Sequence, residues 1–357
     1  KFTNQHLTAF DYINTEFNSE NIFFEKDIKD MLLFNDNQYL LLSKQQLAFI
    51  DRNSQKTINY QLPSVEKQKY TFQSMTLGSK DDLWLITING TVFHFNLLTK
   101  QFSLLASIPE AMPGYQTRGI SFISEKKLMI TTNSGAQIFN PLAGSFTPLL
   151  KVNQQAISSY IWSSKITEKN HHFLAARDGL YYQLAGQKHY NYIASNGDSF
   201  DGAQVKKILV DKQKSIWMFT DSNTYQIVVD NYELSFTPIN KYQNKPVRAR
   251  TPYIDDAGNI WFNLYLFYDP KEERFTDLSH YNINKNVRIN NVPKQPSLPY
   301  FWSANHLVFI QPDLLSKPRN VAPIKVVELN INDNKYLTSQ LDKLTISADN
   351  QQLNLQF

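Results

Sequence analysis

Cysteine does not occur among the 357 residues of the sequence. Its absence excludes a thiol nucleophile, a cysteine-based metal site and any disulfide bond. The absence does not fix the cellular compartment.

The sequence also lacks long hydrophobic runs and long runs of charge of a single sign. The longest apolar runs, such as residues 39–42, have the length of a strand and are too short to span a membrane. The net charge is +4, from 36 basic and 32 acidic residues that are mixed along the chain. Nothing in this pattern indicates nucleic-acid binding, because no basic run stands out.

Glycine is scarce, with 11 residues, although a fold with many tight turns needs residues that tolerate a left-handed backbone. We therefore expect Asn and Asp at many turn positions. Aromatic residues, by contrast, are abundant, with 24 Phe and 19 Tyr, as is typical of folds rich in β-strands.

A pattern recurs about every 44 residues. Its clearest copy, residues 255–275, holds a turn, a short apolar strand with Trp261, a second strand ending at Tyr268 and a third strand with Phe275. The positions equivalent to Trp261 are Leu40, Trp84, Met129, Leu174, Trp217, Trp261 and Tyr300. This period is typical of the four-stranded blade of a β-propeller. The sequence thus predicts an all-β fold, a seven-bladed β-propeller over residues 1–318.

The third and outer strands of the copies follow a spacing rule. The third strand ends in an apolar residue, often followed by Asp or Asn, and the outer strand is reached seven residues later. The residues that mark the outer strand are Phe102, Phe146, Phe236 and Phe275. No helical period separates the strands, which argues against a parallel α/β sheet.

The seventh copy is incomplete. Residues 307–310 predict its third strand, but no outer strand follows in the sequence. Phe10 and Phe17, seven apart, reproduce the third-to-outer signature near the start of the chain. We therefore expect residues 15–17 to close blade seven, since an open edge would invite aggregation. The alternative is that residues 1–20 are the tail of a preceding propeller.

After Pro318 the pattern changes. Residues 321–331, 341–346 and 353–357 predict the opening strands of a small β-sandwich. A sheet of two or three strands is marginal alone. Residues 319–357 are therefore interpreted as a truncated Ig-like module that packs on a neighbour.

Two segments resemble a known family. Residues 255–270, Asp-x-x-Gly-Asn-Ile-Trp-Phe followed by Tyr-Asp-Pro, resemble the regulator-propeller repeat, which builds the sensor region of hybrid two-component systems that control polysaccharide-utilisation genes. Residues 309–313, running into 323–332, resemble the junction to the Ig-like domain called Y_Y_Y, and residues 353–357 are similar to the next core strand of that domain.

This resemblance implies a sensor function. The chain would be a fragment of a larger periplasmic sensor, the extracytoplasmic part of an inner-membrane protein whose full length carries a histidine kinase. It would bind an oligosaccharide and would work as a homodimer, beside a neighbouring propeller and the Ig-like module of the same protein. This fragment itself would not be an enzyme.

No motif for catalysis or metal binding stands out. The seven His show no metal-ligand spacing, and His171 and His172 begin a strand, where neighbours face opposite sides. The acidic pairs Asp81-Asp82 and Asp255-Asp256 occupy the same turn of two copies, where Asp caps backbone N–H groups. We therefore expect no catalytic residue, no metal and no cofactor.

The tryptophans divide by their repeat position. Trp84, Trp217 and Trp261 share one position, which indicates packing between blades. Trp162 and Trp302 lie off that position and are candidates to bind a sugar ring, with core packing as the alternative.

The loops at one mouth of the propeller supply polar candidates. Ligands of propellers usually lie over the loops that join an outer strand to the next inner strand, and a second strand to a third. The polar candidates on such loops are Tyr115, Arg118, Arg177, Asp198, Arg248 and Arg250. Arg binds a carboxylate or sulfate through two parallel hydrogen bonds, which suits an acidic glycan. The alternative is that these Arg side chains are merely solvated.

The sequence therefore favours a non-enzymatic sensor propeller. One alternative is a propeller glycoside hydrolase or lyase, which requires two carboxylates about 5 to 9.5 Å apart at the channel mouth. Another is a protein-interaction scaffold, which would expose an apolar patch.

Overall fold

The computed structural model describes a chain made almost entirely of β-strands. The described residues are 17–21, 28–35, 38–43, 46–51, 56–65, 68–79, 81–109, 115–151, 153–195, 197–202, 204–239, 241–243, 245, 247–249, 252–255, 257–263, 266–277, 300–303, 306–310, 328–331, 334–337 and 353–356. Only the backbone is described for 17–21, 64–65, 68–69 and all described residues from 300 onward.

The chain divides into two compact units. One is Phe17–Gln311, and the other combines Lys1–Glu16 with Pro312–Phe357. Within the described residues no helix is long and apolar enough to cross a membrane.

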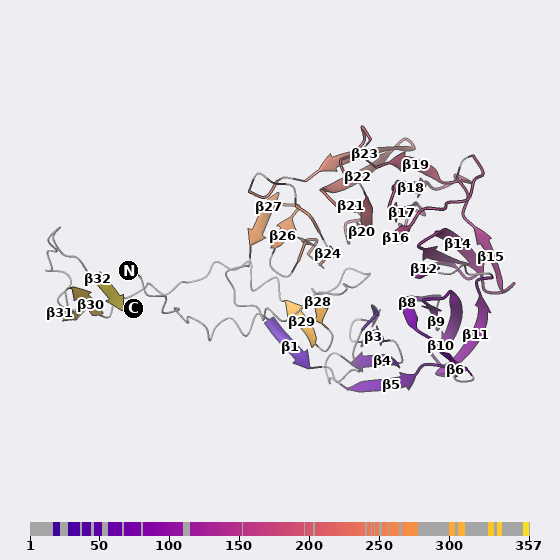
Figure 1. Cartoon of the computed structure of the whole chain (residues 1–357), viewed down its shortest axis with the longest axis horizontal. Helices are drawn as coiled ribbons and strands as arrows, with labels where there is room; N and C mark the ends of the chain where they lie inside the picture. Colours follow the sequence, from indigo (N-terminus) through magenta and orange to yellow (C-terminus); the bar gives the residue numbers. More distant parts are fainter. Residues whose placement is uncertain are drawn as a thin grey trace. The chain divides into compact units, whose positions relative to one another are not determined.

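Phe17–Gln311 contains six four-stranded antiparallel blades arranged around a centre, with the first strand of each blade innermost (Figure 1). Blades 1 to 3 are β2 (Asp30–Asn35), β3 (Gln38–Leu42), β4 (Gln46–Asp51) and β5 (Thr57–Gln61); β8 (Phe72–Leu77), β9 (Asp82–Thr87), β10 (Thr91–Asn96) and β11 (Gln101–Ser107); and β12 (Thr117–Ser124), β13 (Lys127–Thr132), β14 (Gly135–Asn140) and β15 (Ser145–Pro148). Blades 4 to 6 are β16 (Ile161–Ile166), β17 (His172–Ala176), β18 (Gly179–Gln183) and β19 (Asn191–Ala194); β20 (Val205–Val210), β21 (Ile216–Thr220), β22 (Thr224–Asp230) and β23 (Glu233–Pro238); and β24 (Tyr253–Ile254), β25 (Ile260–Trp261), β26 (Leu266–Asp269) and β27 (Arg274–Asp277). A short hairpin of β6 (Ser64–Val65) and β7 (Gln68–Lys69) lies between blades 1 and 2 in the chain.

The seventh repeat does not form a seventh four-stranded blade, so the expectation of seven such blades is corrected to six. It forms a three-stranded sheet in the order β1-β29-β28, from β1 (Phe17–Asn21), β28 (Tyr300–Ser303) and β29 (His306–Ile310). The N-terminal strand pairs antiparallel with β29, with Phe17 opposite Ile310. This is the pairing expected for the N-terminus, but the strand runs from Phe17 to Asn21, whereas residues 15–16 lie outside the described residues.

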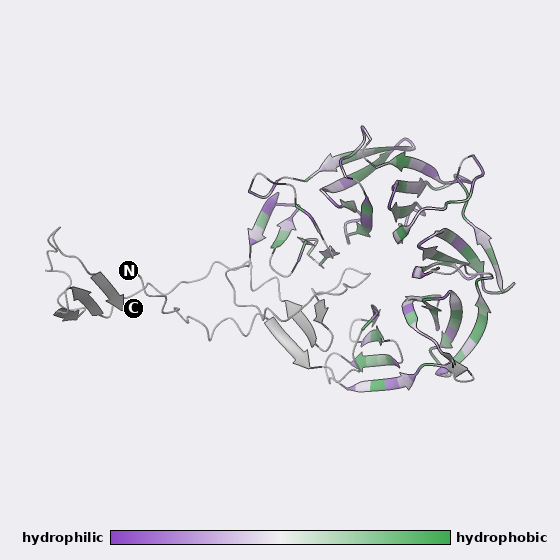
Figure 2. Cartoon of the chain, viewed as in Figure 1, coloured by the Kyte–Doolittle hydropathy of each residue, from purple (hydrophilic) through white to green (hydrophobic). Residues whose placement is uncertain are grey.

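Apolar clusters between neighbouring blades hold the ring together. Leu85, Phe93 and Phe95 of blade 2 share one cluster with Leu40 and Phe49 of blade 1. Similar clusters join blades 2 and 3, 3 and 4, 4 and 5, and 5 and 6. Figure 2 shows hydrophobic residues along the strands of the six blades, where the central strands are the most deeply buried.

The inner strands are also joined by polar side chains. Asp30 of β2 accepts hydrogen bonds from the Ser74 hydroxyl and the Met75 N–H of β8, each at 2.9 Å. The hydroxyls of Ser121 in β12 and Ser164 in β16 lie 2.9 Å apart. These short side chains therefore link neighbouring inner strands through hydrogen bonds.

The seven-residue spacing has a direct structural cause. Phe95 lies opposite Phe102, and Phe139 lies opposite Phe146, across the hairpin of the third and outer strands. The ring centroids of these pairs are 4.4 and 4.7 Å apart. Such cross-strand aromatic pairs stabilise the edge of a sheet. The four outer-strand Phe residues that the spacing predicted all lie in outer strands.

The Asn or Asp after the third strand caps the next turn. Asn96 Oδ1 accepts the N–H groups of Leu98 and Thr99, and Asp269 Oδ1 accepts those of Lys271 and Glu272. These residues therefore hold turns mainly as hydrogen-bond acceptors. The left-handed positions fall largely to other residues, since only two of the eight non-glycine residues with positive φ are Asn: Lys100, Gln154, Asn170, Lys214, Asn231, Tyr232, Gln243 and Glu273. Asn and Asp do occupy turns, as expected. The reason given for this, their tolerance of a left-handed backbone, was largely wrong for the described residues, because most of them act there as hydrogen-bond acceptors.

A buried Asp fixes the turn between the first and second strands in two blades. Asp255 accepts hydrogen bonds from the N–H groups of Ala257 and Asn259, from the Asn259 amide and from Trp261 Nε1. Burial raises the pKa of Asp255, and these donors partly offset that rise. The structure thus confirms that Asp255 serves its turn.

The same arrangement recurs in blade 5, where Asp211 accepts a hydrogen bond from Trp217 Nε1 at 2.9 Å. In blade 2 the equivalent position is Gly78, and the buried Nε1 of Trp84 has no partner among the described residues. Asp82 differs from Asp255, because it begins β9 and contacts His94 Nε2 at 2.7 Å.

The tryptophans at the shared repeat position are packing residues, as expected. Trp84 belongs to the cluster between blades 2 and 3, and Trp217 to the cluster between blades 5 and 6. Trp261 is fully buried and lies with its ring centroid 4.7 Å from that of Phe267.

The other unit contains a three-stranded antiparallel sheet in the order β31-β30-β32. Its strands are β30 (Glu328–Ile331), β31 (Asn334–Leu337) and β32 (Leu353–Gln356). β30 and β32 fall within expected strands, whereas β31 arises in a stretch taken as polar. The expected strand at 341–346 lies outside the described residues.

Replacing Asp255 by Ala is expected to lower the free energy of unfolding by about 3 kcal/mol, because buried donors on Trp261 and Asn259 lose their acceptor. Urea denaturation measures this change. Asp198→Ala, at an exposed turn residue, is the matched control and should stay within about 0.5 kcal/mol of the parent. Equal losses in both variants would show that the buried carboxylate does not hold the turn.

Candidate functional site

The inner strands of blades 3, 4 and 5 begin at one mouth of the propeller. The loops between second and third strands meet the starts of these inner strands there. Asn133 N donates to Gln116 O, Arg177 N to Tyr160 O, and Asp221 N to Gln204 O. This mouth therefore gathers both loop types on which the sequence candidates were expected.

Four side chains from these three blades form a stack at the mouth, which we call the cation–aromatic stack. Arg118 Cζ lies 4.7 Å from the centroid of the Tyr160 ring. The Tyr160 and Trp162 rings are 4.1 Å apart between centroids and tilted by 40°. Lys206 Nζ lies 4.1 Å from the centroid of the Trp162 ring. Each cation is attracted by the negative face of the ring that it covers.

Two glutamines help to hold the cations of the stack. Arg118 Nη2 donates to Gln116 Oε1 at 2.9 Å, and Lys206 Nζ donates to Gln204 Oε1. Each of these glutamines lies two residues before its cation, and each cation lies where the register of its strand shifts, between Thr117 and Gly119 and between Val205 and Lys207. The cations are therefore positioned before any ligand arrives.

The electrostatics of the mouth favour a negative partner. Burial lowers the pKa of Lys206, the charge of Asp221 opposes that effect, and the charge of Arg177 adds to it. Burial also raises the pKa of the Tyr160 phenol, against the charge of Arg118. Lys206 is thus partly desolvated, near the exposed Arg177 and the carboxylate of Asp221.

Two donors of the stack have no acceptor. Trp162 Nε1 and Arg118 Nε are both buried and lack a hydrogen-bond partner among the residues that the structure describes. A buried donor without an acceptor costs free energy, on the order of 1–3 kcal/mol. Because both groups can only donate, a ligand that satisfies them must present acceptor oxygens.

A cavity of about 320 Å³ adjoins the stack and is lined by the inner strands of blades 1 to 5. Arg118 and Trp162 lie at its wall, together with Ser163 and Lys207. Asp30 is the only carboxylate in the described lining, and its Oδ2 accepts the two hydrogen bonds from β8. The centre of the propeller therefore offers space next to the unpaired donors.

The structure brings together three of the sequence candidates, Arg118, Trp162 and Arg177. Tyr115 lies close in sequence, but it packs against the apolar cluster between blades 2 and 3, where burial raises the pKa of its phenol to about 12. Its role as a ligand residue is therefore less favoured than packing.

The remaining candidates are not joined to the stack by any contact that the structure describes. Asp198 and Arg248 are exposed side chains, and Asp198 lies in a turn closed by a bridge between Gly197 and Phe200. Arg250 and the side chain of Trp302 lie outside the described residues.

Sequence reasoning missed Tyr160 and Lys206, although the repeat contains the signal. Arg118, Trp162 and Lys206 are spaced by 44 residues, which is the period of the blades. Gln116, Tyr160 and Gln204 follow the same period, two residues earlier. A search for chemistry at equal repeat positions would have found the whole stack.

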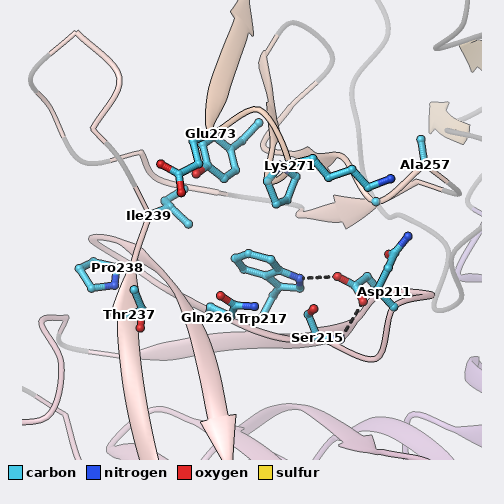
Figure 3. Close-up of a pocket in the computed structure, with 14 residues that line it drawn as sticks. Asp211, Ser215, Trp217, Gln226, Thr237, Pro238, Ile239, Ala257, Lys271 and Glu273 are labelled. Atoms are coloured by element: carbon cyan, nitrogen blue, oxygen red, sulfur yellow. Dashed lines mark hydrogen bonds between the residues drawn. The ribbon is translucent and has the colours of Figure 1, made fainter.

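A second cavity, of about 390 Å³, lies between blades 5 and 6. Figure 3 shows the Trp217 ring on one side of it and Lys271 and Glu273 on the other. Trp217 is only 3% exposed, and Asp211 bonds to Trp217 Nε1 and to the Ser215 N–H. The Asp211 carboxylate in its lining thus serves the turn of blade 5, and we do not take this cavity as the functional site.

No three His, Asp or Glu side chains gather as a metal site would require in the part of the chain that the structure describes.

Comparisons with known proteins concern the fold. No family model matches the chain, and no curated protein matches it in sequence. Among solved structures, it is similar to the extracellular domain of a hybrid two-component system from B. thetaiotaomicron, with a TM-score of 0.67 and 14% identity. That match covers 94% of this chain and 45% of the other, so this chain spans less than half the length of that domain.

Shorter propellers are similar as well. Virginiamycin B lyase from Staphylococcus aureus matches with a TM-score of 0.62 and 10% identity, covering 83% of this chain and 98% of the lyase. YCF48 from Cyanidioschyzon merolae matches with a TM-score of 0.58 and 12% identity, covering 84% of this chain and 99% of YCF48. At these identities the comparisons establish a β-propeller and do not assign a function.

Replacing Lys206 by Met is expected to raise the free energy of unfolding slightly, by less than about 1 kcal/mol, because it keeps the stem over Trp162 and removes a charge that burial disfavours. Urea denaturation measures the gain, which should not shrink in about 1 M NaCl, because burial rather than repulsion between charges is its main cause.

Lys214→Met is the matched control, since exposed Lys214 is paired with Glu168 and should lose stability or stay unchanged. A loss above about 1 kcal/mol in Lys206→Met would mean that the lysine supports the fold and is not held ready for a ligand.

Proposed function

We propose that this chain is the ligand-binding propeller of an extracytoplasmic sensor of the hybrid two-component type, and that it binds an acidic oligosaccharide at the cation–aromatic stack. The observation that carries the proposal is the pair of buried donors without a described partner, Arg118 Nε and Trp162 Nε1, near the further cations Lys206 and Arg177. The similarity in fold to an extracellular domain of such a system supports the sensor context.

The chemistry of the stack suits a sugar acid. A carboxylate or sulfate supplies the acceptor oxygens that Arg118 and Trp162 lack. Its negative charge also reduces the electrostatic repulsion between Lys206 and Arg177. The rings of Tyr160 and Trp162 add apolar surface against which a sugar ring can lie. A neutral sugar would satisfy the donors through hydroxyls but would leave the excess positive charge in place.

The proposal extends to the parts that the resemblance suggested. The sheet β1-β29-β28 acts as the seventh blade, with the N-terminal strand as its outer strand. The repeats are of the regulator-propeller type, and residues 319–357 begin a Y_Y_Y Ig-like module.

The complete sensor would be a periplasmic homodimer with a neighbouring propeller, and it would control polysaccharide-utilisation genes. Signalling then requires that the ligand binds one arrangement of these parts more tightly than the other.

A lyase or hydrolase is the competing function, and the similarity in fold to virginiamycin B lyase gives a reason to test it. A glycosidase would place two carboxylates across the sugar bond. The described lining of the central cavity contributes Asp30, whose Oδ2 accepts two hydrogen bonds from β8. The sensor proposal therefore predicts binding without turnover, whereas the enzyme predicts new products.

Trp162→Phe tests the site directly, because it keeps a ring and removes one donor. We expect it to weaken binding of oligogalacturonides about tenfold, the effect of one hydrogen bond to a charged group. Isothermal titration calorimetry on the complete extracytoplasmic region measures the affinity, and chromatography of the incubated sugars detects products.

Trp84→Phe is the matched control, since Trp84 Nε1 is also buried without a partner but lies between blades 2 and 3. Equal affinities for Trp162→Phe and the parent would place the ligand elsewhere. Product formation would replace the sensor by the enzyme, and absence of binding to sulfated and uronic oligosaccharides alike would overturn the acidic-glycan proposal.

A further inference from the structure

We infer that a groove between blades 3 and 4 is a second binding site, for a small anion with a flat apolar body such as an aromatic carboxylate or sulfonate. The groove has a volume of about 480 Å³ and is lined by residues from both blades. It is separate from the cation–aromatic stack, because the two share no lining residue.

The charges around the groove have one sign. Lys127 and Lys188 are exposed at its rim, and His172 and His189 also line it. No Asp or Glu occurs among its described lining residues. The cavity between blades 5 and 6 differs, since Asp211 and Glu273 line it together with Lys271.

Part of the wall of the groove is apolar, beside polar residues such as Gln183 and Gln187. Leu149 and Leu184 are buried side chains, and Ile123 and Ile138 are half-buried beside them. These apolar residues favour a ligand with a hydrophobic body, because removal of apolar surface from water lowers the free energy of the complex. A partly apolar wall with basic groups around it therefore favours amphiphilic anions over neutral or cationic molecules.

His172 is held in place at the groove. Its Nδ1 lies 3.1 Å from the hydroxyl of Tyr190, and its Nε2 lies 3.4 Å from Asn170 Oδ1. Tyr190 is 3% exposed and donates or accepts according to the histidine tautomer. The imidazole therefore presents a fixed, protonatable edge between the two blades.

The surroundings of His172 favour the neutral form of its imidazole in the free protein. Burial lowers its pKa, and the positive charges of Lys127 and His171 lower it further. Lys188 and His189 are the other basic groups of the lining, and Tyr190 and Asn170 are its neutral neighbours. An anion in the groove would oppose these charges and raise the pKa, so that binding takes up a proton and tightens as the pH falls.

The test uses 1-naphthalenesulfonate as the probe and 1-naphthalenemethanol as its neutral counterpart, with calorimetric titration of the whole chain at pH 7.5 and pH 5.0. The sulfonate should bind at least about tenfold more tightly than the alcohol, from two or more charge interactions.

Lys127→Gln and Lys188→Gln should each weaken sulfonate binding about threefold, which is the range of one exposed charge pair. Lys126→Gln is the matched control, because Lys126 is exposed next to Lys127 but does not line the groove.

The pH readout isolates His172. The parent should bind the sulfonate more tightly at pH 5.0 than at pH 7.5, and His172→Gln should remove most of that difference while it retains binding at pH 7.5. Trp162→Phe, which changes the stack, should leave sulfonate binding unchanged, so failure here is distinct from failure of the proposed function. Equal affinity for sulfonate and alcohol, or equal effects of the Lys126 and Lys127 variants, would overturn the second site.

Discussion

Burial of one blade face against the next is the interaction on which this structure depends. A single four-stranded sheet has two faces, and each face needs an apolar partner. Here one apolar cluster fills each of the five junctions between the six four-stranded blades. Trp84 and Trp217 lie in two of these junctions. These side chains, although of a type that often binds sugars, here stabilise the packing between blades.

The same stacking explains how a site arises at the mouth. Because each blade repeats after about 44 residues, residues that share a repeat position are brought side by side around the centre. Arg118, Trp162 and Lys206 share such a position in blades 3, 4 and 5. Arg250 follows Lys206 by the same 44 residues in the sequence. The mouth therefore collects one such side chain from each of blades 3, 4 and 5, and its chemistry depends on which residue each copy carries.

The groove between blades 3 and 4 arises from a local departure from that regularity. The turn containing Asn170 and the stretch from Leu184 to Tyr190 leave space beside blade 3, and basic residues line it. Two sites with related chemistry can thus exist on one propeller. Basic residues are spread along the whole chain, and the packing of the blades decides which of them lie close together. The central stack positions its cations through Gln116 and Gln204, whereas the groove exposes Lys127 and Lys188 at its rim.

The sequence alone determined the strand content, the blade period and the hairpin pairing, because these depend on contacts between residues close in the chain. Phe95 and Phe102 are an example, since seven residues of hairpin place them opposite each other. The sequence also pointed to the loops of this mouth and to Arg118, Trp162 and Arg177, which the structure brings together there. It did not show that Tyr115 packs inward or that Tyr160 and Lys206 complete the stack. Those outcomes depend on contacts between neighbouring blades, such as Arg118 with Tyr160 and Trp162 with Lys206, which are 42 and 44 residues apart in the chain. Only the packing of neighbouring sheets against each other decides such contacts.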